Sequence, residues 1–333
     1  MPLPCSKGMT TVRLDPSTSL DVLLGRGRPL LLGQWGVLLE SALRSRAQLD
    51  LPLHSESRVE VHLALSQGKS PGQSYAIITG RDTARLNLTG SGYAALGRAI
   101  GEVLGKTTYT PGEVNLAASE QRRQTPFSRL IQYWPLHFKN CYEKRPTEFL
   151  LDLLDYRALL GTTELWLFFS QNQYECPFGE HPEAYSLEQW TKLKALHARA
   201  KALGLKTGLV STLNLVYTDQ ARVHPEWRAA VHPQSGWTLQ TVCPSNPEAR
   251  AQLIANHRQL VEEADELDTL CLFFYDWGGC GCEKCAPWVE TGLKLAEEIA
   301  AACREVRPEL EVLITDWHFT PEEIHHLDRK SVV

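Results

Sequence analysis

The sequence predicts an α/β protein in which a small, sandwich-like α/β domain precedes an incomplete (β/α)8 barrel. Two observations carry this prediction. The first part of the chain combines short alternating strands with helical stretches, which is typical of a small sheet flanked by helices. Farther along, near-continuous apolar strands alternate with amphipathic helices, and such strands belong to a parallel sheet that is covered on both faces.

The small domain is built from five predicted segments. Residues 28–47 begin with apolar, strand-like residues and continue in a helical pattern. Residues 58–66 alternate between apolar and polar side chains, which indicates a half-buried strand. Residues 74–80 and 83–90 are expected to form a hairpin, because only two residues connect them. Residues 93–106 place small and apolar residues three and four positions apart, which predicts a helix.

A polar stretch separates the two halves. Residues 107–127 show no clear period, so we place the domain boundary there, between a first domain at 1–124 and a second at 125–333. The second domain is expected to contain five strands, and a helix is expected after each of the first four. These strands are predicted at 128–134, 164–170, 206–212, 269–276 and 311–317.

The loops of the second domain favour a barrel. Long loops follow the strands and short loops follow the helices, which fits a (β/α)8 barrel better than a doubly wound sheet. Functional residues lie at the C-terminal ends of the strands in both folds. A dinucleotide-binding function has weak support, because Gly90 and Gly92 lack the third glycine of the phosphate-binding loop.

The barrel is expected to be incomplete. Residues 128–333 supply five strands, whereas a whole barrel needs eight strands and about 250 residues. The last residues start a helical pattern, and the final six, DRKSVV, resemble translated sequencing-adapter DNA. We therefore expect a fragment of a longer bacterial protein, with apolar edges at its first and fifth barrel strands that lower its solubility.

Composition excludes several classes of function. The 333 residues include 39 acidic and 34 basic side chains, a net charge of −5, and no basic run stands out. Nucleic acid and anionic membrane surfaces are therefore not expected as partners. The sequence shows neither a signal-peptide pattern nor an apolar stretch near the ~20 residues of a membrane span, which predicts a cytoplasmic location. The sequence has nine cysteines, an odd number, and most of them are expected to be free thiols or metal-bound thiolates.

Three of these cysteines form the sharpest local pattern. Cys280, Cys282 and Cys285 have the spacing CxCxxC, and the intervening glycine lets the backbone wrap closely around an ion. A structural Zn²⁺ needs a fourth ligand, for which Cys243, in the loop after the third barrel strand, is the best candidate. Cys176, in the loop after the second barrel strand, is the runner-up, and His181, His224 and His232 are weaker candidates. The alternative is a set of reduced thiols without metal.

Asp276 is the predicted catalytic residue. It stands at the end of the fourth barrel strand behind an apolar run, where partial desolvation would raise the pKa of its carboxyl group, as a general acid requires. The alternative is a turn residue that accepts hydrogen bonds from Gly278 and Gly279. Asp316 ends the fifth strand, so the two carboxyl groups are expected within the ~5 to 10 Å used in glycoside hydrolysis.

Aromatic residues are dense around the predicted strand ends. They are Tyr133, Trp134, Tyr174, Tyr217, Trp237, Trp277 and Trp317. Sugar rings stack on aromatic faces, although each of these residues alone is as well explained by ordinary packing. The residues that we expect to bind a carbohydrate substrate are Tyr133, Trp134, His137, Asn172, Trp277, Trp317 and His318.

Two stretches resemble known families. Residues 58–106, with VEVHLAL, SYAIITG, ARLNLTG and GSGYAALGRAIGEVLG, resemble the small domain that precedes the barrel in bacterial β-N-acetylhexosaminidases of glycoside hydrolase family 20 and in α-glucuronidases. The second half, with RLIQYWPLHFKN and YDWGGCGCEKCAPW, resembles bacterial glycosidase-like proteins with a YDxGGCxCxxCxPW motif. The resemblance implies a carbohydrate-active enzyme.

The hexosaminidase pattern is incomplete at the fourth barrel strand. In that family the strand ends with adjacent Asp and Glu residues, whereas here Trp277 follows Asp276. The resemblance therefore carries over Asp276 alone, and it favours a glycoside hydrolase of undefined linkage over a true hexosaminidase. The alternative from another class is a non-catalytic carbohydrate-binding protein with a structural zinc–cysteine loop.

Overall fold

The computed structural model describes most of the chain. The described residues are 10–49, 51, 57–66, 74–79, 85–118, 121–232, 241–274, 279–317 and 319–330. The chain divides into two compact units. The first unit comprises Met1–Gln132, Glu148–Glu164 and Arg199–Leu205, and the second comprises Tyr133–Thr147, Leu165–Ala198 and Lys206–Val333. The predicted boundary at residues 124 and 125 stays a prediction.

The first unit contains a five-stranded sheet in the order β2-β3-β5-β4-β8. The strands are β2 (Thr18–Leu24), β3 (Ser57–Leu65), β4 (Ser74–Thr79), β5 (Arg85–Gly90) and β8 (Gln121–Gln124). Strands β2, β3 and β5 pair in parallel, and β4 pairs antiparallel with β5 and β8. The pairing of β4 with β5 confirms the predicted hairpin. The alternation seen in the sequence buries Val59, Val61 and Leu63 on one face of β3.

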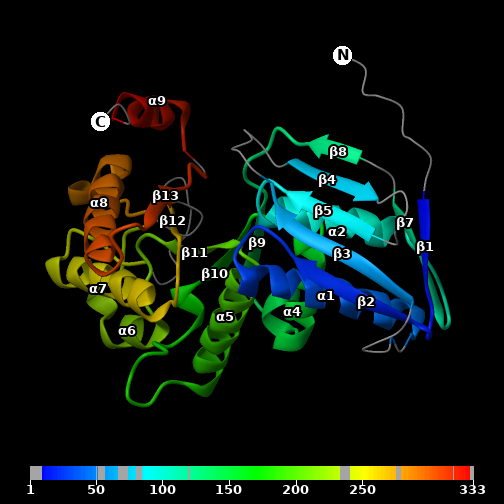
Figure 1. Cartoon of the computed structure of the whole chain (residues 1–333). Coiled ribbons are helices and arrows are strands. Elements are labelled where there is room, and N and C mark those ends of the chain that lie inside the picture. The colour runs from blue at the N-terminus through cyan, green and yellow to red at the C-terminus, as the bar shows by residue number, and fades with distance from the viewer. Residues whose placement is uncertain are drawn as a thin grey trace. The chain divides into compact units, whose positions relative to one another are not determined.

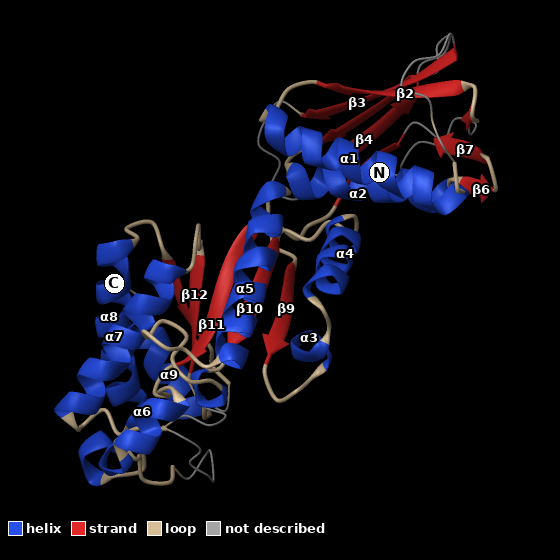
Figure 2. Cartoon of the chain, turned by 90° about the horizontal axis from the view of Figure 1, so that it is seen from below, coloured by secondary structure: helices blue, strands red, loops and turns tan. Residues whose placement is uncertain are grey.

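Two helices, α1 (Pro29–Ala47) and α2 (Tyr93–Lys106), pack beside each other along this sheet (Figure 2). The bounds of α2 are those predicted. The apolar start of the 28–47 segment is helical, so the expected strand-like start is wrong. Pro29 fixes a helical φ at the first position, and the apolar side chains Leu32, Trp35 and Leu39 form one buried stripe.

The polar stretch between the two halves is also more regular than expected. Strand β1 (Thr10–Leu14) forms a three-stranded antiparallel sheet with β6 (Thr108–Thr110) and β7 (Glu113–Ala118). Gly112 turns the chain between β6 and β7 with a φ of +78°. Short, polar strands of this kind leave no clear hydrophobic period, which explains why the sequence predicted an irregular segment.

The second half contains a five-stranded sheet in the order β13-β12-β11-β10-β9, so every strand lies beside its predecessor in sequence. The strands are β9 (Ile131–Leu136), β10 (Glu164–Phe169), β11 (Lys206–Thr212), β12 (Thr269–Phe273) and β13 (Glu311–Ile314). The pairs β11–β12 and β12–β13 run parallel. An order that never reverses is typical of a barrel, because a doubly wound sheet changes direction once. The predicted fold class is therefore confirmed.

Helices separate these strands, as Figure 1 shows. The main ones are α4 (Thr147–Ala158), α5 (Ala184–Ala202), α7 (Pro247–Glu263) and α8 (Trp288–Val306), and the shorter ones are α3 (Cys141–Lys144) and α6 (Thr218–Val223). A further helix, α9 (Pro321–Lys330), follows the last strand. Helices α7 and α8 pack against each other. None of the helices in the described ranges is both long and apolar enough to cross a bilayer.

The two faces of the barrel sheet have different partners. Phe169 of β10 contacts the ring of Trp190 on α5, and the hydroxyl of Ser211 on β11 lies 3.3 Å from Nε2 of His257 on α7. The alternate residues Phe168 and Val210 therefore point to the opposite face. There they form a buried cluster with Leu215 and Cys271, against which Trp166, Phe273 and Leu313 pack.

Two glycines allow α2 to lie close to the backbone at the C-terminal end of α4. A Cβ atom added to Gly101 would lie 2.1 Å from the carbonyl oxygen of Leu159, and one added to Gly97 would lie 2.7 Å from that of Ala158. Both oxygens belong to the backbone, which cannot move away as a flexible side chain could. The packing of α2 therefore requires glycine at these two positions.

Replacing Gly101 with alanine is expected to destabilise the protein. Because the added methyl group overlaps a backbone oxygen, Gly101→Ala should lower the free energy of unfolding by about 1–3 kcal/mol, measured by urea denaturation. Gly105→Ala on the same helix is the control, since nothing lies within 4 Å of its added Cβ and alanine favours the helix by up to about 1 kcal/mol. Equal effects of the two substitutions would contradict this packing.

The stability of the second unit is expected to depend on the protonation of His257. The imidazole is fully buried, with Nδ1 2.8 Å from the carbonyl oxygen of Leu253, and burial lowers its pKa from 6.5 to about 4. The stabilisation from the neutral ring is therefore complete above pH 6.5. It declines by about 1.4 kcal/mol per pH unit as the pH falls towards 4. Urea denaturation of His257→Gln at pH 7, 6 and 5 should show a shallower decline than the parent, and identical slopes would refute this.

Candidate functional site

Four cysteine side chains meet in the second unit. The sulfur atoms of Cys243, Cys280, Cys282 and Cys285 all lie within 4.8 Å of one another. Cys243 belongs to the connection between β11 and α7, and the other three belong to the connection between β12 and α8. Both connections follow parallel neighbouring strands, so they leave the sheet at the same edge. The structure thus joins Cys243 to the CxCxxC segment, as predicted.

The distances within this four-cysteine cluster suit a tetrahedral ion. The Sγ atom of Cys243 lies 3.7 Å from that of Cys282 and 3.7 Å from that of Cys285. A zinc ion with Zn–S bonds of about 2.3 Å separates its sulfur ligands by about 3.8 Å. A disulfide would bring two sulfur atoms to about 2.05 Å, and the four cysteines are free thiols. The donor set therefore fits a soft metal ion.

The backbone around the cluster is closely packed. Gly281 donates its N–H to the carbonyl oxygen of Ala230 at 3.0 Å, and a Cβ atom at this position would lie 2.1 Å from the carbonyl oxygen of Val231. Gly279 has a φ of +95°, in the left-handed region that favours glycine. Cys280 and Cys285 are buried, whereas Cys243 and Cys282 are partly exposed. The glycines of this segment therefore allow the thiols to turn inward.

Hydrogen bonds within the cluster change the acidity of its thiols. A hydrogen bond from the Cys285 thiol, helped by the backbone of Cys282 and Ala230, lowers the pKa of Cys280 to about 5 against the opposing effect of burial. The same bond raises the pKa of Cys285, and burial raises the pKa of Cys243. Cys280 therefore loses its proton readily, whereas a bound cation is needed to keep several of the four cysteines deprotonated.

Sequence reasoning missed two polar side chains beside the cluster. The hydroxyl of Ser245 lies 3.0 Å from Sγ of Cys285. Asn214 is fully buried and hydrogen-bonds to Val242 and Gly279, the residues that directly precede Cys243 and Cys280. A single Asn or Ser in a loop carries no periodic signal, so the sequence offered no means of identifying them.

The predicted catalytic residues are only partly described. Asp276, Trp277, Trp237 and His318 lie outside the described residues, so their positions stay predictions. The side chain of Asp316 is exposed, and its backbone oxygen accepts a hydrogen bond from the N–H of Phe319 at 3.0 Å. The expected pairing of Asp276 with Asp316 therefore stays a prediction as well.

Two predicted substrate-binding residues, Tyr133 and Trp317, lie at the two ends of a row of aromatic rings on the face of the sheet opposite its helices. The rings of Tyr133 and Phe168 are 6.4 Å apart, those of Phe168 and Phe273 are stacked at 5.9 Å, and those of Phe273 and Trp317 are 6.5 Å apart. We call these four residues the aromatic row. Its two ends are open to solvent, since Tyr133 is 44% and Trp317 is 54% exposed.

His137 stands beside this row, while two other predicted residues lie elsewhere. The His137 ring meets the Phe168 ring edge-on at 4.7 Å, and burial lowers the pKa of His137 to about 4, so the imidazole is neutral at pH 7. Trp134 is 1% exposed and stacks on Tyr142, because successive residues of a strand point to opposite faces. Asn172 is buried and accepts a hydrogen bond from the Ser170 hydroxyl.

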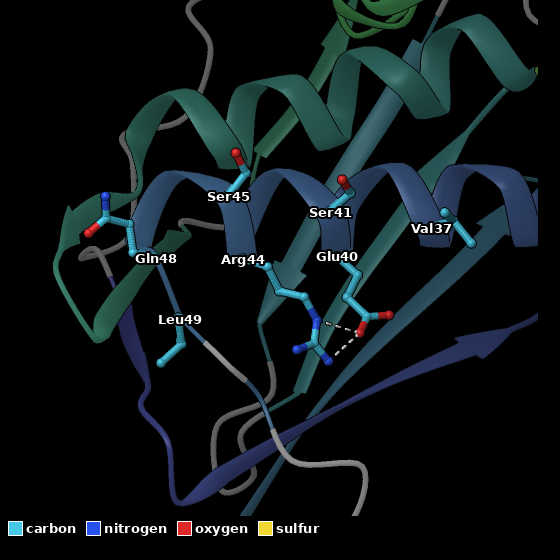
Figure 3. A pocket seen from close by; sticks show the side chains of 7 residues that line it. All are labelled: Val37, Glu40, Ser41, Arg44, Ser45, Gln48 and Leu49. Atoms are coloured by element: carbon cyan, nitrogen blue, oxygen red, sulfur yellow. Dashed lines mark hydrogen bonds and ion pairs between the residues drawn. The ribbon is translucent and has the colours of Figure 1, made fainter.

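A separate surface cavity of about 590 Å³ lies in the first unit, along α1 (Figure 3). Its lining residues are Val37, Glu40, Ser41, Arg44, Ser45, Gln48 and Leu49. The guanidinium group of Arg44 donates two hydrogen bonds to the same carboxylate oxygen of Glu40, as the figure shows. The charges of Arg44 and Glu40 thus neutralise each other. None of the predicted site residues lines this cavity.

Comparison with known proteins identifies the fold. No protein-family model matches the sequence, and no curated protein matches it. Among solved structures, the chain is similar to the family 20 exo-β-N-acetylglucosaminidase of Vibrio harveyi, with a TM-score of 0.65 and 9% identity over 94% of this chain and 54% of that chain. It is also similar to the chitobiase of Flavobacterium johnsoniae, with a TM-score of 0.64 and 11% identity over 95% of this chain and 52% of that chain.

A third similar structure is the family 20 β-N-acetylhexosaminidase of Streptomyces coelicolor, with a TM-score of 0.66 and 11% identity over 98% of this chain and 72% of that chain. The chain thus spans about half the length of the Vibrio and Flavobacterium proteins. These similarities show that the chain has the fold of family 20 glycoside hydrolases. It contains the α/β domain and part of the barrel that follows it. The resemblance noted in residues 58–106 is confirmed at the level of the fold.

Proposed function

We propose that the protein is a carbohydrate-active enzyme that hydrolyses O-glycosyl bonds. The observation that carries the proposal is the likeness to family 20 glycoside hydrolases over nearly the whole chain. Fold alone does not determine chemistry, so the assignment of roles depends on the residues at the strand ends. In a barrel these ends form the face on which reactions take place.

Asp276 is the proposed general acid. It follows β12 in sequence, and Asp316 follows β13, the strand that pairs with β12 in parallel, with Leu272 opposite Ile314. Paired strands lie about 4.8 Å apart, so side chains that follow them fall within the range used by pairs of carboxyl groups in glycoside hydrolysis. In this role the carboxyl group of Asp276 protonates the glycosidic oxygen of the leaving group. The carboxylate of Asp316 is proposed to act from the opposite face of the sugar ring.

The aromatic row is the proposed sugar-binding surface. Tyr133 and Trp317 offer exposed rings on which the apolar face of a sugar can stack, while Phe168 and Phe273 hold them from below. The neutral imidazole of His137 can exchange a hydrogen bond with a sugar hydroxyl. Trp277 and His318 are proposed to belong to the same surface on the strength of their positions in sequence.

The four-cysteine cluster is the proposed site of a structural Zn²⁺. Four thiolates complete a tetrahedron and leave no open position for water or substrate, so the ion would not take part in the reaction. Its proposed role is to fix the connection between β12 and α8, which contains Asp276. The distances of 3.7 Å between sulfur atoms support this assignment.

The second candidate function is carbohydrate binding without catalysis. Trp277 occupies the place at which the hexosaminidase pattern has its catalytic Glu, which favours this alternative. In that case the aromatic row binds sugar, and Asp276 only accepts a hydrogen bond from a hydroxyl group. Calorimetry with a sugar panel then shows binding while aryl glycosides are not hydrolysed.

Replacement of Asp276 tests the catalytic proposal. If Asp276 donates the proton, Asp276→Asn should lower turnover of aryl glycosides by about 10²- to 10⁴-fold, because the amide cannot supply it. Asp265→Asn serves as the control, since Asp265 precedes β12 and its 75% exposed side chain pairs with Lys194. Undiminished turnover in Asp276→Asn would remove this residue from the mechanism, and an inactive parent would favour the binding protein.

Elemental analysis tests the metal proposal. We expect about one zinc per chain in the purified protein, and Cys282→Ser should lose its zinc to a chelator that the parent withstands, because the site loses one of four thiolates. Cys176→Ser is the control, since Cys176 lies outside the four-cysteine cluster. A parent with zinc well below one per chain would refute the site.

A further inference from the structure

The connections that carry the four cysteines are joined by a buried amide. Asn214 lies just after β11 and is fully buried. Its Nδ2 group donates to the carbonyl oxygen of Val242 at 3.1 Å and to that of Gly279 at 3.2 Å, and its Oδ1 atom accepts from the N–H of Gly279 at 3.2 Å. Val242 precedes Cys243, and Gly279 precedes Cys280. One side chain thus contacts the backbone next to a cysteine on both connections.

The backbone of Asn214 strengthens one of these attachments. Its carbonyl oxygen accepts a hydrogen bond from the N–H of Val242 at 2.9 Å, so Asn214 and Val242 are joined by two bonds. Gly279 is joined to the Asn214 side chain by two bonds as well. Because each partner is held twice, neither connection can rotate about a single hydrogen bond. The separation between the backbone beside Cys243 and the backbone beside Cys280 is therefore fixed.

We infer that Asn214 is a positioning residue for the metal centre, which holds the two cysteine-bearing connections in register before an ion binds. This inference rests on the proposed binding of zinc by the four cysteines. Asn214 does not touch the ion, and it acts through the backbone of Val242 and Gly279. Its contribution is preorganisation, because ligands that are already in place lose less freedom when the ion enters.

The chemistry of the side chain is specific to asparagine. Only an amide supplies two N–H donors and one acceptor on a side chain of this length. Aspartate has the same shape, but it would place a negative oxygen against the carbonyl oxygens of Val242 and Gly279. Alanine would leave the same backbone groups buried without their partner. Both substitutions therefore loosen the separation of the connections while all four thiols remain.

Other contacts would keep the cluster assembled without Asn214. The N–H of Gly281 reaches the carbonyl oxygen of Ala230, and the Ser245 hydroxyl lies beside Cys285. Loss of Asn214 should consequently weaken metal binding without abolishing it. Residues that orient metal ligands from outside the coordination sphere typically contribute 10- to 100-fold in affinity. We expect an effect of this size.

The test compares Asn214→Ala with Asn256→Ala in the full chain. Asn256 is also a buried amide, but it bonds to Gln220 and Gln252, away from the cysteines. Zinc affinity is measured by competition with a chromophoric chelator, and thermal stability is recorded in parallel. Asn214→Ala should bind zinc 10- to 100-fold more weakly than the parent, while Asn256→Ala should bind within about threefold despite a similar loss of stability.

Two further measurements keep the outcome decisive. Co²⁺ bound to Asn214→Ala should show altered tetrahedral absorption bands, which a change in overall stability would not cause. Should Asn214→Ala fail to fold, Asn214→Ser takes its place, because its uncharged hydroxyl is too short to hold both connections. If these variants bind zinc as tightly as the parent, the proposed role of Asn214 is wrong, while the proposed metal centre is unaffected. A parent that binds no zinc would overturn the metal centre, and the present inference with it.

Discussion

Parallel pairing of β11, β12 and β13 in their order along the chain places three successive connections at one edge of the sheet. Cys243 follows the first of these strands, the CxCxxC segment follows the second, and Asp316 follows the third. Residues that are far apart in sequence therefore lie at the same edge of the sheet because of the strand order alone. If the strand order reversed between β11 and β12, as at the switch point of a doubly wound sheet, these strands would not be neighbours and Cys243 would lie far from the other three cysteines.

The connection after β12 is attached on both sides. The backbone N–H of Phe274 lies 3.3 Å from the hydroxyl of Thr315, which follows β13, and Gly279 bonds to Asn214, which follows β11. The segment that contains Asp276 thus begins and ends at residues held by the two neighbouring strands. A closed four-thiolate ion next to Gly279, bound as proposed, would tighten the second attachment, so in the proposed function it would support the loop that contains Asp276 and would not be a reactant.

The parts of the structure that follow from periodicity could be predicted. The five barrel strands are short apolar runs between longer amphipathic stretches, and helix α2 has apolar residues at helical spacing. Cys243 could be chosen over Cys176 because neighbouring strands of a barrel share a rim. Tyr133 and Trp134 could also have been separated in advance, since adjacent strand residues face opposite sides, and only Tyr133 is exposed.

Other features depend on contacts that a sequence does not encode locally. The helical start of α1 depends on the buried stripe of Leu32 and Trp35, and the strands β6 and β7 are stabilised by pairing with each other and with β1. Asn214 is identified only by what its amide touches. Long-range hydrogen bonds of this kind leave no pattern in neighbouring residues, so structure was needed to find them.

The lack of charge in the aromatic row limits the class of sugar that the proposed site would bind. Tyr133, Phe168, Phe273 and Trp317 carry no charge, and the lowered pKa of His137 keeps its imidazole neutral at pH 7. Among the described residues of this surface, the aromatic row and His137 offer no cation, so a uronic acid or a phosphorylated sugar would bury its anion against these rings without a charge partner from them, which is costly. A neutral ring with one apolar face loses little on stacking there. The row therefore favours a neutral sugar, although the small domain resembles that of α-glucuronidases as well as that of hexosaminidases.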